Sequence, residues 1–141
     1  FDKVFCSDLR RAKETAAIAA PHWDAEPTAL LREVNVGTLA GQPLSALTKE
    51  QDAHIFEVGY GDFDGETQEA FAHRVATMME QVAALPCANV ALFSHAGWLR
   101  GMLDIVLGLR LPRARVRCKN CTVAVFEYTD SGWSLHSWVN L

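Results

Sequence analysis

The chain has 141 residues, of which 50% are hydrophobic and 21% are charged, and its formal net charge is −4. This is the composition of one soluble globular domain, so we treat residues 1–141 as a single domain. The acidic balance argues against a nucleic-acid surface, and no apolar run approaches the roughly 20 residues that a membrane-spanning helix needs.

The first element expected from the sequence is a strand over residues 4–6, followed by Ser7 and Asp8. Both residue types are good helix N-caps, and the next stretch, residues 9–20, is rich in Ala, Arg, Lys and Glu until Pro21 ends it. The sequence therefore predicts a strand, a turn and a helix at the start of the chain.

Residues 21–65 are rich in Gly, Pro, Asp and Thr and are expected to be mostly loop, with one short helix opening at Pro43. Loops of this length in a compact domain tend to be functional. Thr67 is expected to cap an amphipathic helix, because apolar residues recur behind it at helical spacing. These residues are Phe71, Val75, Met78, Met79, Val82 and Leu85.

A continuous apolar run over residues 89–93 predicts a buried strand of a parallel sheet, and residues 98–109 predict a helix directly behind it. Residues 122–128 and 133–139 alternate and are separated by a turn, which indicates a closing hairpin. Strands that alternate with helices predict an α/β fold, a three-layer α/β/α sandwich with a mostly parallel central sheet.

Four cysteines are too few for a disulfide-dense secreted scaffold, which favours a reducing, cytoplasmic compartment. Cys118 and Cys121 have the Cys-x-x-Cys spacing of a redox pair or of half a zinc site. A tetrahedral site needs two more ligands, and the sequence has no second close pair of Cys or His. We therefore expect no metal and no cofactor, with a thiol or zinc protein as an alternative hypothesis.

Two strand ends carry side chains that suit a phosphate. Arg10 and Arg11 follow the first strand, and His95 follows the strand that ends at Phe93. Ligands of open α/β sheets bind beyond the carboxyl ends of the strands, next to helix N-termini that favour anions. The planar guanidinium group of arginine matches phosphate oxygens in a bidentate way. The sequence therefore predicts an anion site at this edge of the sheet.

Four segments, in this order, resemble motifs of the histidine phosphatase superfamily, which also holds cofactor-dependent phosphoglycerate mutase. The family patterns are S-x-L-x-R-A-x-x-T-A, L-x-E-x-x-x-G-x-x-x-G, G-E-[ST] and S-H-x-G-x-x-R. They match residues 7–16, 31–41, 65–67 and 94–100. The resemblance implies a phosphoglycerate mutase-like fold and a small phosphorylated metabolite as substrate, and it leaves a homodimer open.

The resemblance also implies roles for individual residues. Arg11 and His95 would hold the transferred phosphoryl group, and Glu33 would give a proton to the leaving oxygen. Arg10 lies at a position that varies in the family, and Glu66 has a rival role as a helix-start residue.

Ala96, next to His95 in its motif, completes the expected set of site residues. The family's remaining motif, R-H-G, has no match in this sequence. Its His is the nucleophile that becomes phosphohistidine, so we expect the nucleophile upstream of residue 1 and no activity without it. In the family its strand is expected between the strands that end at Ser7 and Ser94, so the sheet should lack this strand.

The sequence therefore predicts a phosphomonoester hydrolase that acts through phosphohistidine without a metal. Phosphatase is favoured over mutase because the loop after Glu33 lacks the Glu-Arg-x-x-Gly form usual in the mutases. A mutase-type phosphotransferase and a non-catalytic phosphate-binding module without a nucleophile are the alternatives.

Overall fold

The computed structural model describes residues 1–110 and 115–141 and contains a three-stranded parallel sheet. Its strands are β1 (Lys3–Ser7), β2 (Glu26–Thr28) and β3 (Val90–Phe93), in the order β2-β1-β3. Cys6 is in register with Phe93, so β1 and β3 end at the same edge of the sheet. The two segments that follow these strands therefore start side by side.

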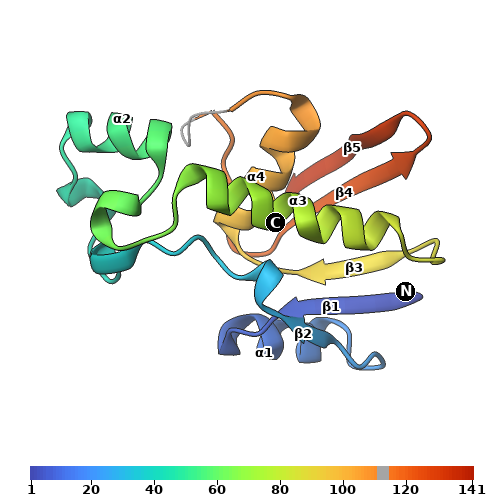
Figure 1. Ribbon diagram of the computed structural model, residues 1–141. Helices are drawn as coiled ribbons and strands as arrows, with labels where there is room; N and C mark the ends of the chain where they lie inside the picture. The colour runs from blue at the N-terminus through green and yellow to red at the C-terminus, as the bar shows by residue number, and fades with distance from the viewer. Residues whose placement is uncertain (111–114) are drawn as a thin grey trace.

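Helices lie on both sides of this sheet (Figure 1). Helix α1 (Arg10–Ala19) packs against β1 on one side, and α3 (Gln68–Ala83) and α4 (Ala96–Leu107) pack together on the other. The burial pattern of β1 reflects both layers, because side chains of a strand alternate between faces. Val4 and Cys6 are buried on the α1 side, and Phe5 packs against the core under α3 and α4. The predicted three-layer α/β architecture is confirmed.

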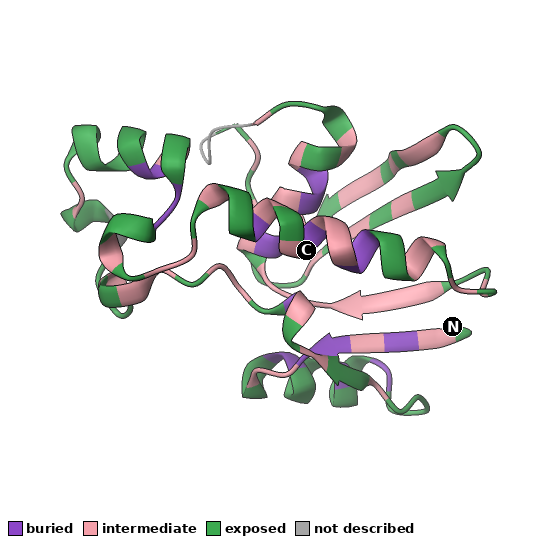
Figure 2. Cartoon of the chain, viewed as in Figure 1, coloured by how far each residue is buried: buried purple, intermediate pink, exposed green. Residues whose placement is uncertain are grey.

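The main hydrophobic core lies between α3, α4 and the sheet, where purple segments of both helices face inward in Figure 2. The amphipathic spacing predicted for α3 accounts for four of the seven buried residues of this core. The buried core residues are Leu31, Phe71, Val75, Met78, Met79, Trp98 and Met102. Gly101 of α4 faces this core. A β-carbon at this position would stand 2.7 Å from the Phe71 ring, so α4 can approach α3 this closely only with glycine there.

The C-terminal strands form the predicted hairpin, with β4 (Thr122–Thr129) antiparallel to β5 (Gly132–Asn140). This hairpin is a two-stranded sheet of its own. The expectation that a further strand separates the strands ending at Ser7 and Ser94 is wrong, because β1 and β3 are hydrogen-bonded directly to each other. Within the described residues β3 pairs on one edge only, so a further strand would have to pair along its other edge.

The long connection after α1 contains more structure than its composition suggested. It includes helix α2 (Lys49–Val58) and 3-10 turns at Ala29–Leu31, Gly37–Leu39, Leu44–Ala46 and Gly61–Phe63. A short 3-10 helix, Leu44–Ala46, follows Pro43 as expected, and the Pro43 carbonyl accepts from the Ala46 N–H at 2.9 Å. The longer helix α2 opens at Thr48, where the Thr48 hydroxyl accepts from the Gln51 N–H and the Gln51 side chain accepts from the Thr48 N–H. This reciprocal cap was the stronger start signal in the sequence.

The start of α1 also differs from the expectation. The N-cap residue is Leu9, which makes no side-chain capping bond, so neither Ser7 nor Asp8 caps the helix. Ser7 is fully buried and accepts from the Leu9 N–H, while the Asp8 carboxylate turns toward Arg32. Neither residue caps α1, because Ser7 is buried in the fold and Asp8 forms an ion pair with Arg32. Thr67, in contrast, caps α3 as predicted.

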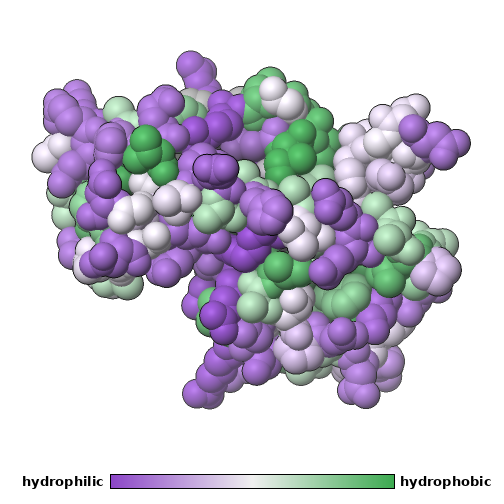
Figure 3. Space-filling view, viewed as in Figure 1, coloured by the Kyte–Doolittle hydropathy of each residue, from purple (hydrophilic) through white to green (hydrophobic). Residues whose placement is uncertain are grey.

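The surface is predominantly hydrophilic in the view of Figure 3, with hydrophobic residues gathered over the C-terminal end of α4. Ile105, Leu107 and Leu109 are exposed there. Among the helices of the described residues, none is long and apolar enough to cross a membrane.

Candidate active site

Arg11 and His95 lie together at the carboxyl edge of the sheet, although 84 positions separate them in sequence. Arg11 is exposed in the first turn of α1, and its Nε donates to Nδ1 of His95 at 3.1 Å. The parallel pairing of β1 with β3 is the cause, because it starts α1 and α4 at neighbouring points. The structure thus brings together the two residues expected to hold a phosphoryl group.

The geometry of this contact fixes the tautomer of His95. The Arg11 Nε–H can only donate, so Nδ1 accepts and the proton of the neutral ring lies on Nε2. Nε2 is buried and has no hydrogen-bond partner among the described residues. Burial and the Arg11 guanidinium lower the pKa of His95 from its usual value of 6.5, which favours this neutral ring. The site therefore presents a buried donor without an acceptor.

Glu33 reaches the same edge from the segment that follows the 3-10 turn Ala29–Leu31. One carboxylate oxygen accepts from the Val34 N–H at 3.0 Å, and the other accepts from the Gly97 N–H at 3.2 Å. A carboxylate at a helix N-terminus is favoured by the partial positive charge there. Gly97 makes room for it, since a β-carbon at this position would stand 2.1 Å from Glu33 Oε1.

A bidentate ion pair ties the Glu33 segment to the end of β1. Arg32 Nε donates to Asp8 Oδ1 at 2.7 Å, and Arg32 Nη2 donates to Asp8 Oδ2 at 2.5 Å. The hydrogen bonds from Arg32 lower the pKa of the Asp8 carboxyl, so it stays ionised. The pair therefore links the residue before the candidate proton donor to the end of β1.

Glu66 faces Arg74 of α3. Arg74 Nε and Nη2 donate to its two carboxylate oxygens at 2.8 and 2.7 Å, and both side chains are at least four-fifths buried. Oε2 also accepts from the Asn35 N–H at 3.3 Å. The Glu66 carboxylate is therefore engaged by protein groups on both oxygens.

The remaining two residues of the expected set lie at the rim. Arg10 extends away with 91% of its side chain exposed and pairs with Glu14 on its own helix. Ala96 is exposed at the first position of α4, where backbone N–H groups have no acceptor within the helix.

Sequence reasoning missed Arg74. The signal was present, because position 74 falls on the apolar stripe of α3 between Phe71 and Val75. A charged residue on a buried helix face needs partners, and Arg74 has them.

The other histidines lie elsewhere. His22 is beside Trp23, His54 pairs with Asp62 at 2.8 Å, and His73 and His136 are exposed on α3 and β5. Over residues 1–110 and 115–141 no cluster of three or more His, Cys, Asp or Glu could hold a metal ion. Cys118 is half-buried and Cys121 is exposed, and both are free thiols.

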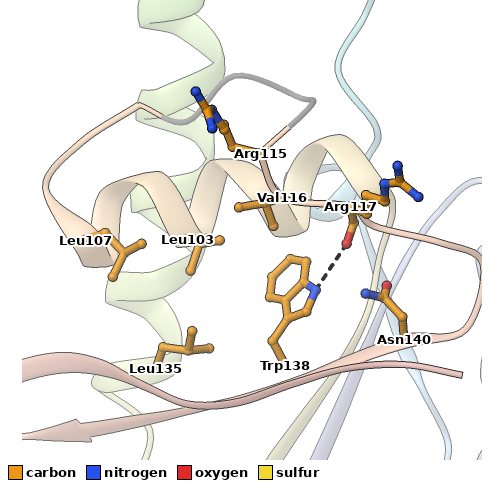
Figure 4. A pocket seen from close by; sticks show the side chains of 8 residues that line it. All are labelled: Leu103, Leu107, Arg115, Val116, Arg117, Leu135, Trp138 and Asn140. Carbon is orange, nitrogen blue, oxygen red and sulfur yellow. Dashed lines mark hydrogen bonds between the residues drawn. The ribbon is translucent and has the colours of Figure 1, made fainter.

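A groove of about 340 Å³ between α4 and β5 shares no residue with this site (Figure 4). Leu103, Leu107, Leu135 and Trp138 give it an apolar wall, and the Trp138 indole N–H donates to the Arg117 carbonyl at 3.2 Å. Its lining includes no acid or histidine, so the groove has no group suited to acid–base chemistry. The candidate site therefore remains the edge of the sheet where Arg11, Glu33 and His95 lie.

The family model described as histidine phosphatase superfamily (branch 1) matches residues 1–141. The chain therefore belongs to the histidine phosphatase superfamily. The probable phosphoglycerate mutase GpmB of Salmonella arizonae is 29% identical to it over 145 residues, which cover 96% of this chain and 67% of the relative.

Solved structures share the fold. A mutant phosphoserine phosphatase from Entamoeba histolytica, crystallised with phosphoserine, is similar with a TM-score of 0.82 over 98% of this chain and 73% of its own. Its sequence is 18% identical, so this likeness concerns the fold alone. Phosphoglycerate mutase from Thermus thermophilus is 29% identical with a TM-score of 0.61, over 78% of this chain and 61% of its own.

Proposed function

We propose that this protein hydrolyses a phosphate monoester of a small metabolite through a phosphohistidine intermediate. Arg11 and His95 hold the phosphoryl group, and Glu33 gives a proton to the leaving oxygen. Ala96 contributes a free backbone N–H beside them, and Arg10 takes no direct part. No metal is required in this scheme, because two positively polarised side chains and a helix N-terminus neutralise the phosphoryl charge.

The buried Nε2–H of His95 carries the proposal. A buried donor without an acceptor costs about 1–3 kcal/mol, and a catalytic role or a bound ion is among the explanations for such a group. A phosphoryl oxygen would accept this hydrogen bond while Arg11 contacts a second oxygen. Binding of an anionic ligand would therefore remove this cost.

The nucleophile must approach the phosphorus in line with the leaving group. His95 is not suited to this role, because Nδ1 is engaged by Arg11 and Nε2 carries the proton. The other four histidines lie on surfaces away from Arg11 and His95. We propose that the nucleophile comes from sequence outside residues 1–141, as the longer relative GpmB makes reasonable.

The position of Glu33 supports the proton-donor role. Its carboxyl lies next to the segment that carries His95, yet it belongs to a different segment from Arg11 and His95, the two groups proposed to hold the phosphoryl group. In the first step a protonated Glu33 would give its proton to the ester oxygen as the P–O bond breaks. In the second step the carboxylate would take a proton from the water that attacks phosphohistidine, which restores the acid and releases inorganic phosphate.

A trapping experiment tests the pathway. The intact protein is incubated with a phosphate monoester, quenched in alkali, where phosphohistidine survives, and examined by peptide mass spectrometry. We expect one phosphorylated histidine, and its absence during turnover would refute the intermediate. The same digest of an Arg11→Ala variant should contain little of it.

Phosphotransfer of the mutase type is the second candidate, favoured by the name of the relative GpmB. Both pathways share the phosphoenzyme and differ only in the acceptor that removes its phosphoryl group. Turnover in ¹⁸O-labelled water separates them, because hydrolysis places one labelled oxygen in inorganic phosphate. Transfer to a second monophosphate leaves the products unlabelled.

A further inference from the structure

We propose that Arg74 is the positioning residue for Glu33, and this inference rests on the proposed function. Arg74 lies on α3, outside the motifs that carry the family resemblance, and its hydrogen bonds go to neither Arg11 nor His95. Its side chain is mostly buried, and its N–H donors are directed at groups around Glu33 or at Glu66.

The guanidinium binds the backbone that leads up to the candidate acid and the carbonyl of Glu33 itself. Nη1 donates to the carbonyls of Leu30 and Arg32 at 2.9 and 2.8 Å, and Nη2 makes a longer contact of 3.4 Å with the Glu33 carbonyl. These residues have no sheet ladder to satisfy their carbonyl groups. Arg74 thus supplies the donors that regular structure would otherwise provide.

Glu66 completes the arrangement from the other side. Its two oxygens take the remaining N–H groups of Arg74, and its Oε2 also accepts from the Asn35 N–H. The Asn35 carbonyl in turn accepts from the Glu66 N–H at 2.7 Å. The segment from Leu30 to Asn35 is therefore held by Arg74 at one end and by Glu66 at the other, and Glu33 lies between these two sets of hydrogen bonds.

The arrangement requires arginine. A guanidinium has five donors in a fixed planar fork, whereas the ammonium group of lysine has three donors on a flexible stem and cannot bind two carbonyls and a bidentate carboxylate together. Two further hydrogen bonds hold this segment: Trp98 Nε1 donates to the Leu30 carbonyl and Ser94 Oγ donates to the Leu31 carbonyl. Loss of Arg74 would therefore shift the backbone around Glu33 while these two hydrogen bonds keep the segment attached to the domain.

The consequence should be a selective defect in proton donation. An alkyl phosphate needs a proton on its leaving oxygen, whereas p-nitrophenyl phosphate releases p-nitrophenolate, a stabilised anion. Phosphoenzyme formation is the step that separates the two substrates, because the second step uses Glu33 with either of them. In Arg74→Lys we expect the rate of phosphoenzyme formation from the alkyl phosphate to fall by about 10- to 100-fold, since a misplacement of about 1 Å can cost about 100-fold. The rate of phosphoenzyme formation from p-nitrophenyl phosphate and inhibition by inorganic phosphate should change by no more than about twofold.

The test is a double-mutant cycle in the intact protein, with Arg74→Lys, Glu33→Gln and the combined variant assayed for the rate of phosphoenzyme formation from both substrates. If Arg74 acts through Glu33, the combined variant is no slower on the alkyl phosphate than Glu33→Gln alone. Additive losses, or equal losses on both substrates, would overturn the inference. Unchanged alkyl phosphate turnover in Glu33→Gln would instead overturn the proposed acid, which is a separate result.

Two further variants keep the test decisive. Arg110→Lys is the matched control, because Arg110 also donates to a backbone carbonyl, that of Glu57, and stacks on Phe56 away from the site. It should retain both activities. If Arg74→Lys does not fold, the neutral pair Glu66→Gln with Arg74→Gln removes both buried charges together. The same selective loss is expected there, and full alkyl phosphate turnover in this pair would refute the inference.

Discussion

Arg11 Nε donates to His95 Nδ1 at 3.1 Å across the carboxyl ends of two adjacent parallel strands. This single hydrogen bond links the first turn of α1 to the start of α4 and fixes which nitrogen of His95 carries the proton. It leaves the other nitrogen as a buried donor without an acceptor among the described residues.

Arg11→Ala should weaken the binding of inorganic phosphate by about 10- to 100-fold. A hydrogen bond to a charged group contributes about 1.5–3 kcal/mol, and each ~1.4 kcal/mol is tenfold in affinity. Calorimetric titration measures the change. Arg10→Ala is the matched control, because its side chain is 91% exposed and pairs with Glu14 on its own helix. Equal losses in both variants would remove Arg11 from the site.

The pKa of His95 should lie below 6.5 in the free protein and rise when phosphate binds. In the free protein, burial is the larger cause of the lowered pKa and repulsion by the Arg11 guanidinium is the second, since both disfavour the charged ring. A bound anion would favour the charged ring and raise the pKa. Nitrogen-15 NMR of the imidazole, assigned with a His95→Gln variant, measures both values. A pKa that does not respond to phosphate would contradict binding at Nε2.

The same shift makes folding stability depend on pH. The folded pKa of His95 is lower than the unfolded value, so between the two the unfolded chain binds more protons. This part of the unfolding free energy is present above pH 6.5 and is lost as pH falls toward the folded pKa. Urea unfolding of the protein and of His95→Gln at several pH values should show a smaller decline in the variant over this window.

Gly97→Ala should mimic the loss of Glu33 while keeping the helix. The added methyl would lie 2.1 Å from Glu33 Oε1, so the carboxylate must leave its place at the start of α4. Alanine is favoured over glycine in helices by up to about 1 kcal/mol, so the thermal midpoint should change little. Alkyl phosphate turnover should fall by about 100-fold or more, as expected when a general acid is lost. Normal turnover would place the proton donor elsewhere.

The Glu66–Arg74 pair should matter far more for stability than the Arg10–Glu14 pair. Removing one partner of a buried ion pair leaves a charge without compensation and costs about 3–5 kcal/mol, whereas exposed pairs on a helix contribute about 0.3–0.5 kcal/mol. Chemical denaturation of Glu66→Ala and Glu14→Ala measures the contrast. Similar denaturation midpoints in the two variants would show that the Glu66–Arg74 pair does not stabilise the segment around Glu33.

The sequence by itself determined the elements whose signals are local. Periodicity located α3 and its buried stripe, Thr67 marked its start, and the apolar run before Ser94 marked β3. The motifs around Arg11, Glu33 and His95 indicated the family. The predictions of these elements and of the family succeeded because each depends on residues that are close together in the chain.

Tertiary structure decided what depends on partners far apart in sequence. Ser7 and Asp8 are good caps by residue type, but burial of Ser7 and the pairing of Asp8 with Arg32 outweigh a capping bond. The strand order also could not be read from the sequence, because β1 and β3 have similar apolar patterns and their direct pairing depends on how the layers pack. For the same reason only the fold shows that Arg74 holds the Glu33 segment, since its hydrogen-bond donors find acceptors that lie 8 to 44 positions away.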